Sequence, residues 1–252
     1  MPEILTADHG KESGHFYRRD GTPAYSYINK KGQEKPTTLR EARKENLVPS
    51  VTTILSCAAK PGLDNWKIDQ AILAALTCPR IDDEPEADYL LRIKLDAREQ
   101  AKKAAERGTL IHAWVQQGFE GKVLPDEGIK YYASAFRRLD EHCGPVNWIC
   151  EKSFVVDGYG GKVDLFFNDV IDVKTSSKDL ATIKTWDEHA LQLAAYRNGL
   201  GLYQARCGIL YIHVKTAESK LIWIPEVELQ RGWRMFMSLK DYWYADKGLE
   251  AT

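Results

Sequence analysis

The chain has 252 residues, a formal net charge of −1 and 44% hydrophobic residues, which is ordinary for a soluble globular protein of one large domain or two small ones. The charge excludes a protein that coats nucleic acid by bulk attraction, but it permits a local basic groove. No apolar run approaches the roughly 20 residues that span a bilayer, and the N-terminus lacks an apolar signal segment. We therefore expect a cytoplasmic protein without a membrane partner.

The five cysteines are scattered along the chain, and no two have C-x-x-C spacing. This pattern argues against a disulfide framework and against a zinc or iron–sulfur site. We expect small buried apolar side chains at Cys57, Cys78, Cys143, Cys150 and Cys207.

The first part of the chain is predicted to form an exposed β-hairpin and a short capped helix. Residues 14–35 have the pattern of two paired strands, with turn signals at Asp20-Gly21 and Lys31-Gly32. Ser50 can cap a helix over residues 51–60, which Pro61-Gly62 would end.

Three longer helices are predicted next. Residues 63–76 are amphipathic, and residues 89–119 have a long helical pattern in which we expect a break at Gly108. Residues 126–143 form a further helix after Pro125.

The pattern changes near residue 145, where runs rich in β-branched and aromatic residues begin. They predict strands at 147–156, 161–167, 170–176, 207–214 and 220–227, with helices at 186–202 and 228–244. We predict one domain, in which residues 1–145 form the hairpin and a mainly helical layer. Residues 146–252 form a β-β-β-α-β-β-α core.

The stretch from Gly160 to Ser177 carries the strongest chemical signal. A two-residue loop at Asn168-Asp169 would place Asp164 opposite Val173, whereas a loop one residue longer would place it opposite Asp172. Only the longer loop brings both carboxylates to one face of the sheet. Lys174 shares a face with Asp172 in either case, because strand side chains alternate.

Two carboxylates and a lysine suit phosphodiester chemistry. Mg²⁺ prefers oxygen ligands and keeps waters and substrate phosphate oxygens in its shell, and a nearby lysine can orient water or offset negative charge. The alternative is an ordinary hairpin with solvated Asp and Lys side chains. Short motifs often arise by chance, so the motif taken alone favours this alternative. Against that, Asp172 follows Val170 and Ile171, and a charge in so apolar a strand should be paired or ligating.

Four other residues could join this group. Gln192 and Tyr196 are four apart and share a helix face, so they could reach a phosphate or a metal-bound water, or only bond to backbone. His112 could be a metal ligand or a satisfied core histidine. Glu151 could add a carboxylate or pair with a lysine at the sheet edge. We expect His189 to lie on the surface.

Several side chains could contact DNA, although each also has a simpler role. Trp66, Trp114 and Trp186 could stack on unpaired bases, and core packing is the alternative. Arg107, Lys178 and Lys184 could contact backbone phosphates or remain solvated. The hydroxyl groups at the start of the predicted helix could bind a phosphate or only cap the helix. They belong to Ser50, Thr52 and Thr53.

Four motifs occur in order along about 90 residues: GxxxH (Gly108 to His112), GxxD (Gly161 to Asp164), DxK (Asp172 to Lys174) and QxxxY (Gln192 to Tyr196). Their order and spacing resemble the RecB-type branch of the PD-(D/E)xK nuclease superfamily. The segments at 48–55 and 64–66 also look like the N-terminal part of phage-type exonucleases in that branch.

The resemblance implies an α/β fold with a restriction-endonuclease-like core, a mixed sheet flanked by helices and a helical N-terminal layer. It implies Asp164, Asp172, the Val173 carbonyl and His112 as ligands of Mg²⁺ or Mn²⁺, and Lys174 as the catalytic lysine. Gln192 and Tyr196 would line the site. The four-cysteine cluster of some relatives is missing, so no iron–sulfur cluster is expected.

The expected activity is a metal-dependent deoxyribonuclease, specifically an exonuclease that acts on DNA ends or single strands. The setting would be phage or bacterial recombination, replication or repair, with a single-strand-annealing or replication protein as partner. Two alternatives remain open: an endonuclease of the same fold, and a DNA-binding module with a vestigial site.

Overall fold

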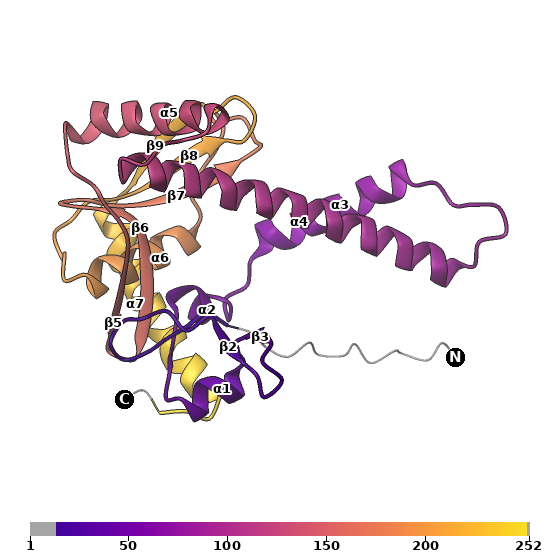
Figure 1. The fold of residues 1–252 in the computed structure, drawn as a ribbon, viewed down its shortest axis with the longest axis horizontal. Helices are drawn as coiled ribbons and strands as arrows, with labels where there is room; N and C mark the ends of the chain where they lie inside the picture. Colours follow the sequence, from indigo (N-terminus) through magenta and orange to yellow (C-terminus); the bar gives the residue numbers. More distant parts are fainter. Residues whose placement is uncertain (1–13, 251–252) are drawn as a thin grey trace.

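The computed structural model describes residues 14–250, and a five-stranded mixed sheet forms their centre (Figure 1). The strands lie side by side in chain order: β5 (Ile149–Val156), β6 (Tyr159–Phe166), β7 (Val170–Ser176), β8 (Cys207–His213) and β9 (Ser219–Ile224). β7 and β8 run parallel, and the other neighbouring pairs are antiparallel. A parallel pair needs a long crossover, and α6 (Asp187–Gly199) supplies it. With α7 (Glu226–Asp246), the predicted β-β-β-α-β-β-α order is confirmed.

Helices cover both faces of the sheet. α4 (Glu86–Phe119) and α5 (Asp126–Cys143) pack on one face around Ile111, Tyr131 and Leu139, which are fully buried. α6 and α7 cover the other face together with α2 (Val51–Leu55). β8 and the first four residues of β7 are buried, and apart from Asp172 these stretches are almost continuously apolar, as expected for strands covered on both faces. Asp172 is the charged exception within the buried part of β7.

The N-terminal segment pairs differently from the predicted hairpin. β2 (Ser26–Ile28) and β3 (Glu34–Pro36) do form a hairpin around the predicted Lys31-Gly32 turn. However, β1 (Phe16–Tyr17) pairs with β4 (Val48–Pro49), ahead of which lies α1 (Leu39–Lys44). The chain also turns back at the predicted Asp20-Gly21 turn, where Tyr17 bridges Pro23 and the Ala24 N–H donates to the Phe16 carbonyl at 2.8 Å. Both predicted turns are therefore present, but the first strand is not exposed as predicted. The physical reason is burial, since the β1 side chains are 2% exposed and belong to the core.

The helix predicted after Ser50 is present but shorter. The Ser50 hydroxyl accepts a hydrogen bond from the Thr53 N–H at 3.0 Å, which confirms the cap. α2 then ends at Leu55, and Pro61 begins α3 (Pro61–Thr77) instead of ending α2. Proline suits the first turn of a helix because its missing N–H would have had no helical partner there.

α4 continues through Gly108, so the predicted break is also wrong. Gly108 is buried against β7, and a Cβ added to it would lie 2.9 Å from the Thr175 hydroxyl. The glycine therefore allows α4 to approach the sheet closely. Relative to alanine, it costs the helix about 1 kcal/mol of stability.

α3 and the first half of α4 form an arm that extends away from the sheet (Figure 1). The arm exposes many large apolar side chains: Leu63, Ile68, Ile72, Leu73, Leu76, Leu90, Leu91 and Leu95. Although α4 has 34 residues, neither it nor any other helix in residues 14–250 is apolar over a stretch long enough to cross a bilayer.

None of the five cysteines, all of which lie within residues 14–250, forms a disulfide. Cys207 is buried, as expected, whereas the other four are only partly buried.

Candidate active site

The loop between β6 and β7 decides where the two carboxylates lie. It contains three residues, Phe167 to Asp169, and Leu165 pairs with Ile171 across it. Continuing this register places Asp164 opposite Asp172, so the longer of the two predicted loops is the correct one. Asp169 fixes the loop, because its carboxylate accepts hydrogen bonds from the Arg206 guanidinium at 2.6 and 3.0 Å.

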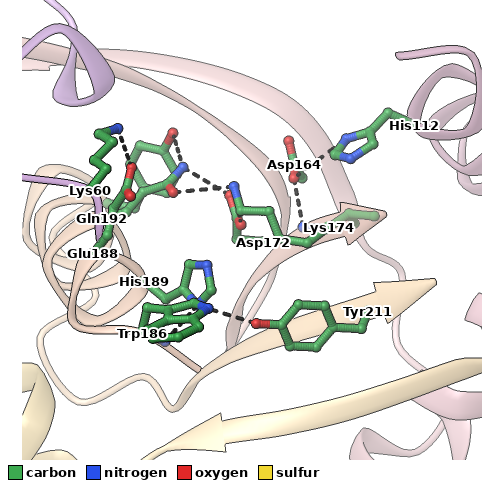
Figure 2. Close-up of polar contacts among 12 residues, drawn as sticks. Lys60, His112, Asp164, Asp172, Lys174, Trp186, Glu188, His189, Gln192 and Tyr211 are labelled. Carbon is green, nitrogen blue, oxygen red and sulfur yellow. Dashed lines mark hydrogen bonds and ion pairs between the residues drawn. The ribbon is translucent and has the colours of Figure 1, made fainter. Parts of the chain in front are cut away.

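Asp172 is the centre of a polar network that links β7 to α6 (Figure 2). Its Oδ1 accepts a hydrogen bond from Gln192 Nε2 at 3.0 Å, and its Oδ2 lies 2.8 Å from Lys174 Nζ. Lys174 also donates to Gln192 Oε1 at 3.3 Å. Gln192 Nε2 lies 2.9 Å from the Tyr196 hydroxyl. The helix pair predicted from i, i+4 spacing thus contacts the strand motif directly.

Asp164 lies beside this network, with its side chain 22% exposed. Its Oδ2 accepts a hydrogen bond from the Val173 N–H at 2.7 Å. His112 approaches from α4, with Nδ1 4.0 Å from that same oxygen (Figure 2). The structure therefore brings six of the predicted residues together from α4, β6, β7 and α6.

The electrostatics of this group favour added positive charge. Burial, followed by the neighbouring Asp172 charge, raises the pKa of Asp164 to about 8. Burial works against the charged form of Lys174, but the charges of Asp172 and Asp164 outweigh it and raise the pKa of the ammonium. Burial also lowers the pKa of His112, which favours the neutral imidazole that ligates metals.

Two motif glycines place these side chains. Gly108 lets α4 approach Thr175 on β7, and this sets the position of His112 one turn later. A Cβ on Gly161 would lie 2.8 Å from the Phe154 ring and 2.9 Å from the Tyr196 ring. Glycine at this position therefore lets Tyr196 pack against β6. The GxxxH and GxxD spacings thus have a steric reason in this chain.

The donor set fits a hard divalent cation. Asp172 Oδ2 is buried and has no hydrogen-bond partner beyond its 2.8 Å ion pair with the Lys174 ammonium. In the described part of the chain, no three Asp, Glu, His or Cys side chains are gathered closely enough to form a metal cage. Mg²⁺ does not require one, since it commonly uses one or two carboxylates plus waters and phosphate oxygens.

A cleft of about 550 Å³ opens beside the group, and Gly108, His112, Gly161, Thr175 and Tyr196 are among its lining residues. Its size is in the range of small-ligand sites. Thr52, predicted as a DNA contact, also lines this cleft and is exposed. Ser50 lines it as well but is only 3% exposed, and its hydroxyl is used for capping.

Of the two roles considered for Glu151, the structure shows pairing with a lysine at the sheet edge. It forms an ion pair with Lys162 on the neighbouring strand β6. Its charge is close enough to contribute to the raised pKa of Asp164.

Two residues predicted as DNA contacts are engaged by other side chains of the protein, and Trp114 takes the core-packing alternative. Trp114 is 7% exposed and packs against Tyr131 in the core between α4, α5 and the sheet. Arg107 binds Glu127 at 2.6 Å and the Tyr131 hydroxyl at 2.8 Å, so its guanidinium is held against α5. Both side chains are used to attach α5 to α4, which the helical pattern alone does not reveal.

The other candidates for DNA contact differ in exposure. Lys178 and Lys184 are exposed, and Trp66 is partly buried. Trp186 is 61% exposed at the start of α6.

Sequence reasoning missed the role of His189, which is partly buried rather than on the surface. Its Nδ1 accepts a hydrogen bond from the backbone N–H of Trp186 at 3.1 Å and lies 3.3 Å from the Tyr211 hydroxyl. The i, i+3 spacing of Trp186 and His189 is the signal that could have revealed this reciprocal cap.

No protein-family model matches the sequence, and no curated protein matches it significantly. Among solved structures, the chain is similar to an exonuclease candidate from Eubacterium rectale, with 15% identity over 54% of this chain and 68% of that one, at a TM-score of 0.36. It is also similar to the alkaline exonuclease LHK-Exo from Laribacter hongkongensis, with 13% identity over 53% of this chain and 81% of that one, at a TM-score of 0.31. At TM-scores below 0.5, neither likeness assigns a fold family or a function to this chain.

Proposed function

We propose that the chain is a Mg²⁺- or Mn²⁺-dependent deoxyribonuclease of the RecB-type branch of the PD-(D/E)xK superfamily. It acts as an exonuclease on DNA ends or single strands. The observation that carries this proposal is that Asp164 lies beside the connected polar group of Asp172, Lys174 and Gln192, next to a cleft. A solvated Asp/Lys ladder would not bury Asp172 to 2% exposure.

Each residue has a role that its contacts support. Asp164 and Asp172, with the Val173 carbonyl and His112, would hold the cation, which when bound supplies Lewis-acid polarisation of a phosphoryl oxygen and a more acidic water. The Lys174 ammonium stabilises negative charge that develops at phosphorus. Gln192 orients both Asp172 and Lys174 through its two amide atoms. Tyr196 anchors Gln192.

The setting proposed for this activity is phage or bacterial DNA recombination, replication or repair, inside a cell. A single-strand-annealing or replication protein is the proposed partner. DNA is the proposed substrate because phosphodiester hydrolysis uses this combination of carboxylates and lysine.

The experiment is a time course on end-labelled DNA, single-stranded and double-stranded, at one defined salt concentration with Mg²⁺, Mn²⁺ or EDTA. The parent protein should digest DNA only with metal, and Lys174→Ala should reduce the rate about 100- to 1,000-fold, as loss of one charge-stabilising donor does. Lys215→Ala, an exposed lysine in the turn after β8, is the matched control and should retain the parent rate. Equal digestion by Lys174→Ala and the parent would refute the assignment.

Two rival functions are separated by the same assay. An exonuclease leaves covalently closed circular DNA intact, whereas an endonuclease of this fold cleaves it. A vestigial site predicts DNA binding without digestion under any metal condition.

A further inference from the structure

The most exposed aromatic side chain near the candidate active site is Trp186, and it faces a separate cavity. This cavity has a volume of about 650 Å³, and its lining includes Lys60, Gly62, Lys178, Trp186 and Glu188. The indole is 61% exposed, although burying a tryptophan is usually favourable. A large aromatic surface left open in a cavity of this size is available to a planar ligand.

The backbone that carries this ring is tied to the first turn of α6. The backbone N–H of Trp186 donates to His189 Nδ1 at 3.1 Å, and the Tyr211 hydroxyl lies 3.3 Å from the same nitrogen (Figure 2). Trp186 is the N-cap of α6 and precedes Gln192 by six residues, which corresponds to about 9 Å along the helix axis at 1.5 Å per residue. The cavity therefore lies at the N-terminal end of the helix that carries Gln192.

Gly62, at the start of α3, keeps one side of the cavity open. A Cβ added there would lie 3.7 Å from Cζ2 of the indole. Any larger side chain would occupy the space beside the ring. The ion pair between Lys60 and Glu188 ties this segment to α6 and forms part of the cavity wall.

The charge around the cavity suits a phosphodiester strand. Two carboxylates line it, and both are neutralised by ion pairs: Glu188 by Lys60 and Asp187 by Arg231. Lys178 is exposed on the rim, four residues after Lys174 on the segment that follows β7. An ammonium at this place can contact a backbone phosphate while a base lies on the indole.

We propose that Trp186 forms a base-stacking subsite that takes one unpaired nucleobase of the substrate strand, with Lys178 at the adjacent phosphate. This inference rests on the proposed nuclease function and specifies its substrate: the strand must be single-stranded or opened at this position. Stacking tolerates any base, because every base has a π-face. The subsite therefore selects for an unpaired strand and not for a sequence.

The test is equilibrium binding of a fluorescein-labelled single-stranded oligonucleotide at low salt in EDTA, where no digestion is expected. Trp186→Ala should weaken binding about 5- to 150-fold, the range expected for loss of one base–aromatic stack. Trp186→Phe should retain part of the affinity. Tyr203→Ala, which removes an aromatic side chain that is 63% exposed in the loop after α6, is the matched control and should bind like the parent.

A second measurement identifies the base as the contact. Oligonucleotides with a single abasic site at successive positions should bind the parent more weakly at one position. The same substitution should have no effect on Trp186→Ala, because the stack is already absent there.

Binding by Trp186→Ala equal to that of the parent, or no measurable binding by the parent, would overturn the subsite. If Lys174→Ala loses digestion while Trp186→Ala binds normally, the nuclease proposal stands and the subsite fails. If binding depends on Trp186 but the parent never digests DNA with metal, the subsite stands and the nuclease proposal fails.

Discussion

Replacing Asp164 with asparagine should stabilise the metal-free protein, because burial and then the neighbouring Asp172 charge disfavour the Asp164 carboxylate. Folding raises the pKa of Asp164 from 3.8 to about 8. Between these values the folded state binds more protons than the unfolded state, so the free energy of unfolding falls as pH rises from about 4 to 8. Asp164→Asn removes this penalty. Its amide oxygen can still accept the hydrogen bond that the Val173 N–H donates to the carboxylate.

The size of the effect follows from the shift. About 4 pKa units at 1.36 kcal/mol each give roughly 6 kcal/mol at pH 8 as an upper bound. Solvent at the 22% exposed side chain and the new amide N–H groups reduce it, so we expect about 1–3 kcal/mol. For a chain of this length that is roughly 2–12 °C in Tm. At pH 5 the gain should be at most about a third as large, because the unfolded carboxyl is then only just above its own pKa.

The assay is thermal unfolding in EDTA at pH 5 and pH 8. Asp169→Asn is the matched control, because Asp169 is also buried but is paired with Arg206. Its loss should lower Tm at both pH values, since charge-assisted hydrogen bonds disappear. A lower Tm for Asp164→Asn at pH 8, or the same gain at both pH values, would refute the cost that burial and Asp172 impose on the Asp164 carboxylate.

Two further predictions concern how the site is assembled. Gly108→Ala places a Cβ 2.9 Å from the Thr175 hydroxyl, so it should displace α4 and reduce metal-dependent digestion at least several-fold, and Thr175→Ala in the same chain should restore most of the rate. Equal rates for Gly108→Ala and the parent would contradict that contact. Tyr196→Phe removes the hydroxyl that contacts Gln192 and should cost about 1 kcal/mol of stability in urea unfolding, with a several-fold slower digestion. An unchanged rate would show that Gln192 is held without Tyr196.

The C-terminal half of the fold could be predicted well because its pattern is strong. β7 and β8 are short segments rich in β-branched or apolar residues, and the helix between them is the crossover that their parallel pairing requires. The N-terminal pairing of β1 with β4 could not be predicted, because it joins segments about 30 residues apart through burial and not through a local turn.

The residues of the candidate site could be predicted from the sequence, but the pairing register of β6 with β7 could not. The sequence allowed two loops between Asp164 and Asp172, and the choice depends on Arg206, a residue far along the chain that binds Asp169. Arg107 and Trp114 looked available for DNA because a helical pattern does not identify which face a second helix covers. α5 covers them both.

Anomalous diffraction from crystals grown with Mn²⁺ would show whether Asp164 and Asp172 hold one divalent cation. The proposal predicts one strong peak within about 2.0–2.6 Å of a carboxylate oxygen from each residue. The peak should disappear in crystals of Asp172→Asn. No peak between these carboxylates at saturating Mn²⁺, or a single peak bound by other residues, would contradict the proposal.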